Sequence, residues 1–182
     1  MLMSNDNVVY VNASDVERIH NGLSDTAKMP IDNLCVGKDI NAYKLFSYAI
    51  IRYKKYHFFL SEKRDGYESE EQLLQVQLVP EDVDELSVNK SFLNALKRKL
   101  NIVGITEELV ESISLKGMKR STREDGVSEI GAVFEIFLTV KTNTTETLDI
   151  SSSWLHEIEI DKTRKIEAET RVIYQHWLKG LI

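Results

Sequence analysis

The chain has 182 residues, of which 42% are hydrophobic and 29% charged, and this size and composition suit one folded globular domain. A net charge of −6, with acidic runs at 68–71 and 81–85, disfavours general nucleic-acid binding because it repels phosphate. A single cysteine (Cys35), a start without a leader-like pattern and the lack of a long apolar run predict a cytoplasmic protein that stays out of the membrane.

Residues 1–43 are expected to form an N-terminal extension packed on the core. The β-prone residues Asn7–Val11 predict a short strand. Asn12 or Ser14 can cap a brief helix after it, because both side chains accept hydrogen bonds from backbone N–H groups. A polar segment then reaches about Asp39, and the sequence predicts no strand or helix in it.

The main domain, residues 44–182, begins with two apolar runs. Leu45–Arg52 and Tyr56–Glu62 predict a β-hairpin around a polar turn. Apolar and polar residues alternate in Leu73–Val79, which predicts a further strand. Pro80–Glu85 is typical of a turn and loop.

An amphipathic helix is predicted next in the chain. Ser87 or Asn89 can cap its start, and Gly104 marks its end because glycine is favoured just past a helix C-terminus. Its apolar stripe consists of Leu93, Leu96 and Leu100. The spacing of this stripe predicts that one side of the helix packs into the core.

The rest of the chain predicts a strand pair and a closing helix. Leu109–Met118 and Ile130–Lys141 are β-prone, and Ser151–Ser153 can cap a short turn. Ala168–Leu181 has the periodicity of a helix. Its apolar face carries Ile173, Trp177 and Leu181. Strands and helices in this order indicate an α+β fold.

From about residue 44 the order of these elements resembles the Nudix fold, and short segments carry the resemblance. Tyr48–Arg52 and Phe58–Arg64 look like the opening hairpin, and Ser91–Ile102 resembles the helix of the Nudix box. Val8–Val11 ahead of the hairpin is similar to a bacterial branch of predicted Nudix phosphoesterases. The resemblance implies a Nudix-like mixed β-sheet sandwiched by helices.

The residues that carry Nudix chemistry differ in this chain. The family holds magnesium with glutamates on a helix reading Arg-Glu-apolar-x-Glu-Glu, where this sequence has Asn94, Ala95, Arg98 and Lys99. Magnesium requires oxygen ligands, whereas the two basic side chains repel a cation. We therefore expect a degenerate Nudix-fold protein with no metal, no cofactor and no catalytic residue.

A basic surface is predicted in place of the metal site. Residues 95, 98 and 99 are spaced i, i+3 and i+4, so we expect them on one helix face apart from the leucines. Phosphate can be bound there through charge-assisted hydrogen bonds. The candidate ligand-binding residues are Asn94, Arg98, Lys99, Arg120 and Arg123. The alternative is a solvated helix end beside the C-terminal dipole.

Other candidate metal ligands are spread along the chain. Glu81, Glu85, Glu124 and Glu129 can form a substitute metal site only if the fold brings them together, and solvated loops are the favoured interpretation. The four histidines have no metal-ligand spacing.

The sequence thus favours a non-catalytic Nudix-like binding or regulatory module that acts through protein interaction. The first alternative is a hydrolase of nucleoside-diphosphate-linked compounds that uses the non-standard carboxylates above. The second is a metal-independent nucleotide sensor or sponge. An unidentified protein is the first expected partner, a nucleotide or phosphate suits the basic surface, and a homodimer is compatible with the sequence.

Overall fold

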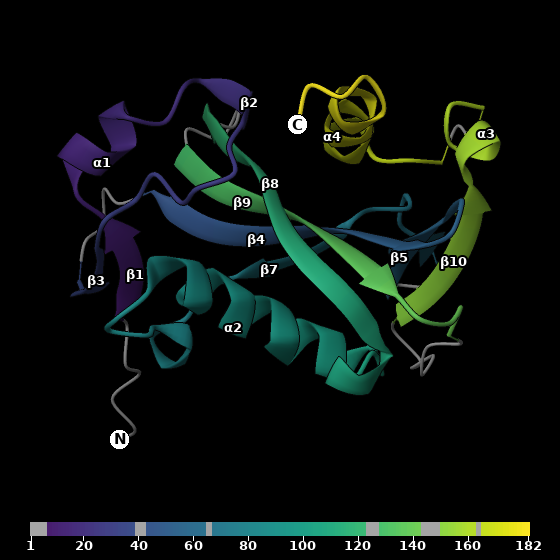
Figure 1. The fold of residues 1–182 in the computed structure, drawn as a ribbon, viewed down its shortest axis with the longest axis horizontal. Helices are drawn as coiled ribbons and strands as arrows, with labels where there is room; N and C mark the ends of the chain where they lie inside the picture. Colours follow the sequence, from purple (N-terminus) through teal and green to yellow (C-terminus); the bar gives the residue numbers. More distant parts are fainter. Residues whose placement is uncertain (1–6, 39–42, 65–66, 123–127, 143–149, 163–164) are drawn as a thin grey trace.

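A mixed β-sheet forms the middle layer of the protein, with helices on both of its faces (Figure 1). The computed structural model describes residues 7–38, 43–64, 67–122, 128–142, 150–162 and 165–182. Across the sheet the strand order is β10 (Ile150–His156), β5 (Tyr56–Arg64), β4 (Lys44–Tyr53), β9 (Ser128–Leu138), β8 (Val110–Thr122) and β2 (Gly22–Asp25). Two short strands, β6 (Tyr67–Glu68) and β7 (Leu74–Gln77), pair with β5 and β4. Strands β4 and β9 run parallel, and the other pairs are antiparallel.

Helix α2 (Val88–Ile102) covers one face of the sheet, and α3 (Glu157–Ile160) and α4 (Ala168–Leu178) lie on the other (Figure 1). Successive side chains of a strand point to opposite faces, so Phe58 joins the core under α2 while Phe59 joins the core under α4. Both rings are fully buried, and each burial contributes roughly 1.5–3 kcal/mol. A sheet covered on both faces explains why its central strands are almost continuously apolar.

The fully buried apolar residues of the described segment before Lys44 pack on the same side of the sheet as α2. Strands β1 (Val8–Val11) and β3 (Leu34–Gly37) pair with each other, α1 (Ala13–Glu17) follows β1, and β2 joins the main sheet beside β8. Its buried apolar residues belong to the α2 core: Val9, Val11, Val16, Ile19 and Ile31. Strands β2 and β3 were not predicted because neither has an alternating apolar pattern, and both form through pairing with distant partners.

Most of the predicted elements are present, and the α+β class is confirmed. The predicted hairpin is β4–β5, and the predicted strand pair is β8–β9. The predicted cap at Ser151–Ser153 is wrong, because these residues lie inside β10 and pair with β5. The closing helix ends at Leu178, so Leu181 lies beyond it and is 53% exposed rather than buried on its apolar face.

Two short 3₁₀ helices lead into the elements around the candidate site. η1 (Pro80–Asp82) lies in the predicted loop before α2, and η2 (Glu107–Leu109) connects the end of α2 to β8. Within the described ranges, no helix combines the length and the apolar character needed to cross a membrane.

Candidate functional site

Helix α2 forms the centre of the candidate site, and its own sequence determines where it begins and ends. The Ser87 hydroxyl accepts a hydrogen bond from the Lys90 N–H (3.2 Å), which confirms one of the two predicted caps. Gly104 follows the last turn with φ of +81°, a conformation that glycine adopts without strain. The face of α2 buried on the sheet consists of Phe92, Ala95, Leu96 and Leu100.

Ala95 lies in the core with none of its surface exposed. The prediction that it shares a face with Arg98 and Lys99, apart from the leucines, is therefore wrong. At 3.6 residues per turn, Ala95 is only about 60° around the helix axis from Phe92, so both side chains point into the sheet. Arg98 and Lys99 border this buried face instead of sharing it with Ala95.

Arg98 is held by the loop that precedes its helix. Its Nε donates to Asp82 Oδ1 (3.0 Å), and its Nη2 donates to Asp82 Oδ2 (2.8 Å) and to the Gln77 carbonyl (3.0 Å). Asn94 donates to the Asp82 carbonyl oxygen (3.0 Å). The hydrogen bonds to Asp82 raise the pKa of Arg98 above its ordinary value. Asn94 and Arg98 thus fasten η1 to α2, and we call this set of contacts the Arg98 clamp.

The other predicted ligand-binding residues lie in different surroundings. Lys99 borders a cavity of about 40 Å³ together with Gln72 and Gln75. Arg120 donates to the carbonyl oxygens of Val16 (3.1 Å) and Ile19 (3.2 Å), and so attaches the α1 region to β8. Arg123 lies outside the described residues. Arg98 and Arg120 share no partner, and phosphate binding by the predicted set stays a prediction.

The described substitute carboxylates lie on two different elements, the loop before α2 and strand β9. Glu129 is buried and lies 3.4 Å from the ammonium group of Lys119, which also contacts Glu169 of α4. Glu81 and Glu85 are exposed on the loop before α2, and Glu124 lies outside the described residues. In the part of the chain that the structure describes, no group of three or more His, Cys, Asp or Glu side chains is arranged to hold a metal ion.

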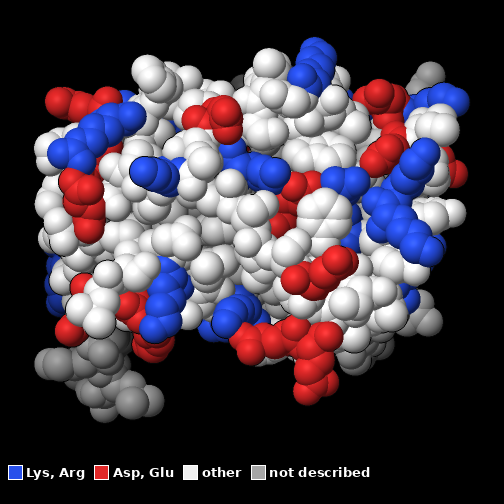
Figure 2. All heavy atoms as spheres, viewed as in Figure 1, with Lys and Arg blue, Asp and Glu red and all other residues white. Residues whose placement is uncertain are grey.

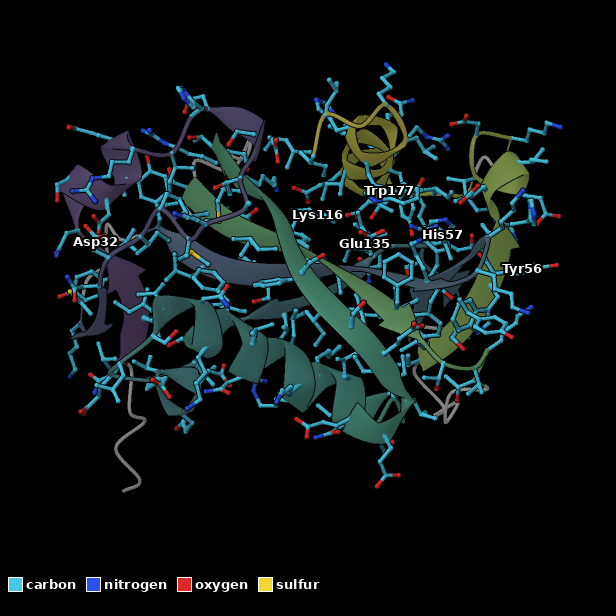
Figure 3. The ribbon with its side chains drawn as sticks, in the orientation of Figure 1. Asp32, Tyr56, His57, Lys116, Glu135 and Trp177 are labelled. Atoms are coloured by element: carbon cyan, nitrogen blue, oxygen red, sulfur yellow. The ribbon has the colours of Figure 1, made fainter. Side chains whose placement is uncertain are left out.

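A buried polar cluster under α4 was not predicted. Arg52 of β4 lies 2.7 Å from Glu135 of β9, and the Trp177 indole donates to the same carboxylate (3.2 Å). His57 Nδ1 is hydrogen-bonded to the Tyr174 hydroxyl at 3.0 Å. Figure 3 shows His57, Glu135 and Trp177 close together between the sheet and α4. The sequence did carry a signal for this cluster, because Arg52, His57 and Glu135 each lie within or at the end of an apolar run that forms a strand.

We call Arg52, His57, Glu135, Tyr174 and Trp177 the α4 cluster. Burial controls the ionisation of two of these side chains. It lowers the pKa of His57 to about 4; the nearby Arg52 charge acts in the same direction, and Glu157 opposes both. Burial also raises the pKa of Tyr174 well above its ordinary value. The His57–Tyr174 pair is therefore neutral at neutral pH. Because His57, Tyr174 and Glu135 are at most 4% exposed and join α4 to strands β5 and β9, the cluster fastens α4 to the sheet.

A larger hollow runs between the C-terminal half of α2 and β8. It has a volume of about 210 Å³, and we call it the α2–β8 groove. Its lining is mainly apolar, with Lys97, Asn101 and Glu107 beside Leu100, Ile105, Val110 and Ile113. An ion pair between Lys97 and Glu107 crosses it. Figure 2 shows acidic side chains gathered beside the C-terminal end of α2 in the same view.

The arrangement of the sheet and its helices is similar to that of Nudix proteins. Tm1382, a protein assigned to the Nudix hydrolases, aligns with a TM-score of 0.66 and 14% identity over 96% of this chain and 99% of its own. A Nudix hydrolase from Nitrosomonas europaea aligns with a TM-score of 0.58 and 13% identity, over 76% of this chain and 90% of its own. The chain has the Nudix fold. The MutT protein from Methanosarcina mazei Go1 has the same arrangement, with a TM-score of 0.57 and 18% identity over 79% of this chain and 98% of its own.

The sequence itself matches no protein-family model and no curated protein. At these low identities the structural similarity establishes the Nudix fold alone, and the same fold supports many different functions. Among the described residues, the hollows beside α2 include the cavity next to Lys99, the α2–β8 groove, and one of about 270 Å³ at the start of the helix, which is lined by residues 32–34 and 83–88.

Proposed function

We propose that the protein is a non-catalytic Nudix-fold module that acts by binding another protein. The observation that carries this proposal is the Arg98 clamp, in which a family metal position holds a guanidinium group that is bound to Asp82. A carboxylate that already accepts hydrogen bonds from Arg98 is itself poorly placed to bind a cation. The helix position that binds metal in Nudix hydrolases therefore serves in this chain to hold η1, the segment that precedes α2.

The neighbouring positions support the same reading. Ala95 has no ligand atom and is fully buried in the core. Lys99 brings a positive charge to the cavity that it borders. Magnesium polarises a diphosphate and activates water only where oxygen ligands hold it. The side chains of Ala95, Arg98 and Lys99 supply no oxygen ligand.

The size of the cavity beside Lys99 disfavours the nucleotide-sensor alternative. Its volume is about 40 Å³, and a water molecule needs roughly 10–15 Å³ by the same kind of measure. The cavity thus has room for a few water molecules, and a nucleotide is many times larger. A sensor function would require this region to open before the ligand enters.

The α2–β8 groove supports a protein as the partner. Its volume of about 210 Å³ and its apolar lining suit inserted side chains of a polypeptide better than a charged nucleotide. The cores of protein interfaces are likewise depleted of charge and lined by apolar residues. None of the residues that line the groove makes a contact of the Arg98 clamp, so the groove and the clamp use different side chains of α2.

A hydrolysis assay tests the non-catalytic half of the proposal. Purified protein is incubated with magnesium or manganese and with nucleoside triphosphates, dinucleoside polyphosphates and nucleotide sugars. We expect no metal-dependent turnover, because α2 lacks the ligand set for the metal. Turnover that disappears in Glu81→Gln or Glu85→Gln, but persists in the exposed control Glu107→Gln, would establish the hydrolase alternative.

A further inference from the structure

Among the described residues, the outer edge of β8 has a partner strand over only part of its length. Strand β2 pairs only with Gly117–Arg120, and the Thr26 N–H bonds to the carbonyl oxygen of Lys116 (3.1 Å). Among the described residues no strand pairs with the outer side of Ser112–Leu115, whose inner side pairs regularly with β9. Alternate residues of this stretch direct N–H and C=O groups away from β9, so the edge offers a template for another strand.

The α2–β8 groove lies directly beside this open edge. Val110 and Ile113 of β8 form one wall, and Leu100 of α2 forms the other. A strand added to β8 would direct alternate side chains toward α2, on the same side as Ile113. Pairing of main chains gives affinity in such complexes, and pockets for alternate side chains give specificity.

The charges around the groove indicate what kind of strand fits. Glu107, Glu108 and Glu111 are exposed at the end where η2 leads into β8, and Lys97 is the basic residue that pairs with the first of them. One positive and three negative side chains leave a net charge of −2 at this end. A basic residue in the partner would therefore meet a complementary surface.

We propose that an extended segment of a partner protein adds to the Ser112–Leu115 edge as an extra strand. An apolar side chain of this segment enters the α2–β8 groove, and a basic residue lies beside Glu108 and Glu111. This inference rests on the proposed protein-binding function, because it names the surface and the chemistry of the partner.

The geometry of β8 favours a short segment over a second copy of this chain. Register shifts between Val110 and Ser112 and between Leu115 and Gly117 interrupt the regular ladder at both ends of the open stretch. Bulges of this kind twist an edge and restrict extended edge-to-edge pairing. A peptide needs only the few residues between the two shifts, together with one side chain in the groove.

Selection and hydrogen exchange together test the inference on the full-length protein. A phage-displayed library of random short peptides is selected against the protein, and enriched peptides are synthesised. We expect alternating apolar residues with a flanking basic residue. Binding should slow amide exchange at Ser112–Leu115, since added strand pairing protects the outward N–H groups.

Two matched variants separate groove binding from other modes. Ile113→Arg fills the groove with a charged side chain and should weaken peptide binding by about tenfold or more. Ser114→Arg places the same side chain on the opposite face of β8 and should change affinity by less than about twofold. If Ile113→Arg does not fold, the exposed double change Glu108→Lys and Glu111→Lys should weaken binding by about tenfold.

Several outcomes would overturn the inference. The selection could enrich no peptide, or peptide binding could leave amide exchange at Ser112–Leu115 unchanged. The variants Ile113→Arg and Ser114→Arg could also bind the peptide equally well. Concentration-dependent self-association that protects the same amides without peptide would assign the edge to a second copy. Metal-dependent hydrolysis would refute the proposed function but leave a measured peptide complex standing, so the two failures are distinguishable.

Discussion

The pH dependence of stability gives the sharpest test of the α4 cluster, and His57 is the group to change. Its pKa is lowered to about 4 in the folded protein, against an ordinary value of 6.5. Well above pH 6.5, His57 is neutral in both the folded and the unfolded state. As the pH falls from 6.5 to 4 the unfolded chain takes up a proton that the folded chain excludes, so the free energy of unfolding decreases.

The magnitude follows from the size of the shift. Each unit of pKa difference corresponds to about 1.4 kcal/mol, so the change of His57 from 6.5 to about 4 predicts a loss of about 3 kcal/mol across this range. The groups that face His57 are Arg52, Tyr174, Glu157 and His156. Glu157 opposes the shift, since its carboxylate lies 3.6 Å from His57 Nε2 and favours the charged ring.

Urea unfolding of the wild type and of His57→Gln at a series of pH values measures this contribution. The variant lacks the histidine, so the difference in unfolding free energy between the two proteins should shrink by about 3 kcal/mol from pH 7 to pH 4. The exposed His20 provides a control, because His20→Gln leaves the α4 cluster intact and should keep the wild-type pH dependence. Parallel curves for the wild type and His57→Gln would refute the reasoning.

The remaining predictions concern α2 and its loop. Leu96→Ala removes a fully buried side chain and should lower the unfolding free energy, measured in urea, by about 2–5 kcal/mol. The control Ile102→Ala changes a residue that is 55% exposed and should lower it by under about 1 kcal/mol. Equal losses in the two variants would show that the buried face of α2 is assigned wrongly. Asp82→Asn keeps the shape of the side chain but removes the charge that Arg98 binds, and should lower the unfolding free energy by about 1–2 kcal/mol. An unchanged melting temperature would show that the Arg98 clamp contributes nothing to stability.

Local patterns in the sequence were enough to predict most of the secondary structure. The leucine spacing and the Ser87 cap belong to α2 itself, so its existence and its ends were readable before the sheet was known. The same holds for the β4–β5 hairpin, whose two apolar runs are adjacent in the chain. Strands β2 and β10 were missed because each lies at an edge of the sheet and is only partly buried, which leaves a weak apolar pattern.

The partners of the charged side chains were decided by tertiary structure. The spacing of Arg98 and Lys99 placed them near one another on α2, but only the fold brought Asp82 and Gln77 to Arg98, so the attachment of η1 by Arg98 could not be predicted. The α4 cluster joins residues from β4, β5, β9 and α4, which are far apart in the sequence. A pattern among near neighbours in the chain cannot predict contacts of this kind. The sequence by itself determined which segments are amphipathic, because that depends on near neighbours in the chain. The tertiary structure determined which charges are paired and, within the described part of the chain, where the edge of β8 lacks a partner strand, because both depend on side chains and strands that become neighbours only on folding.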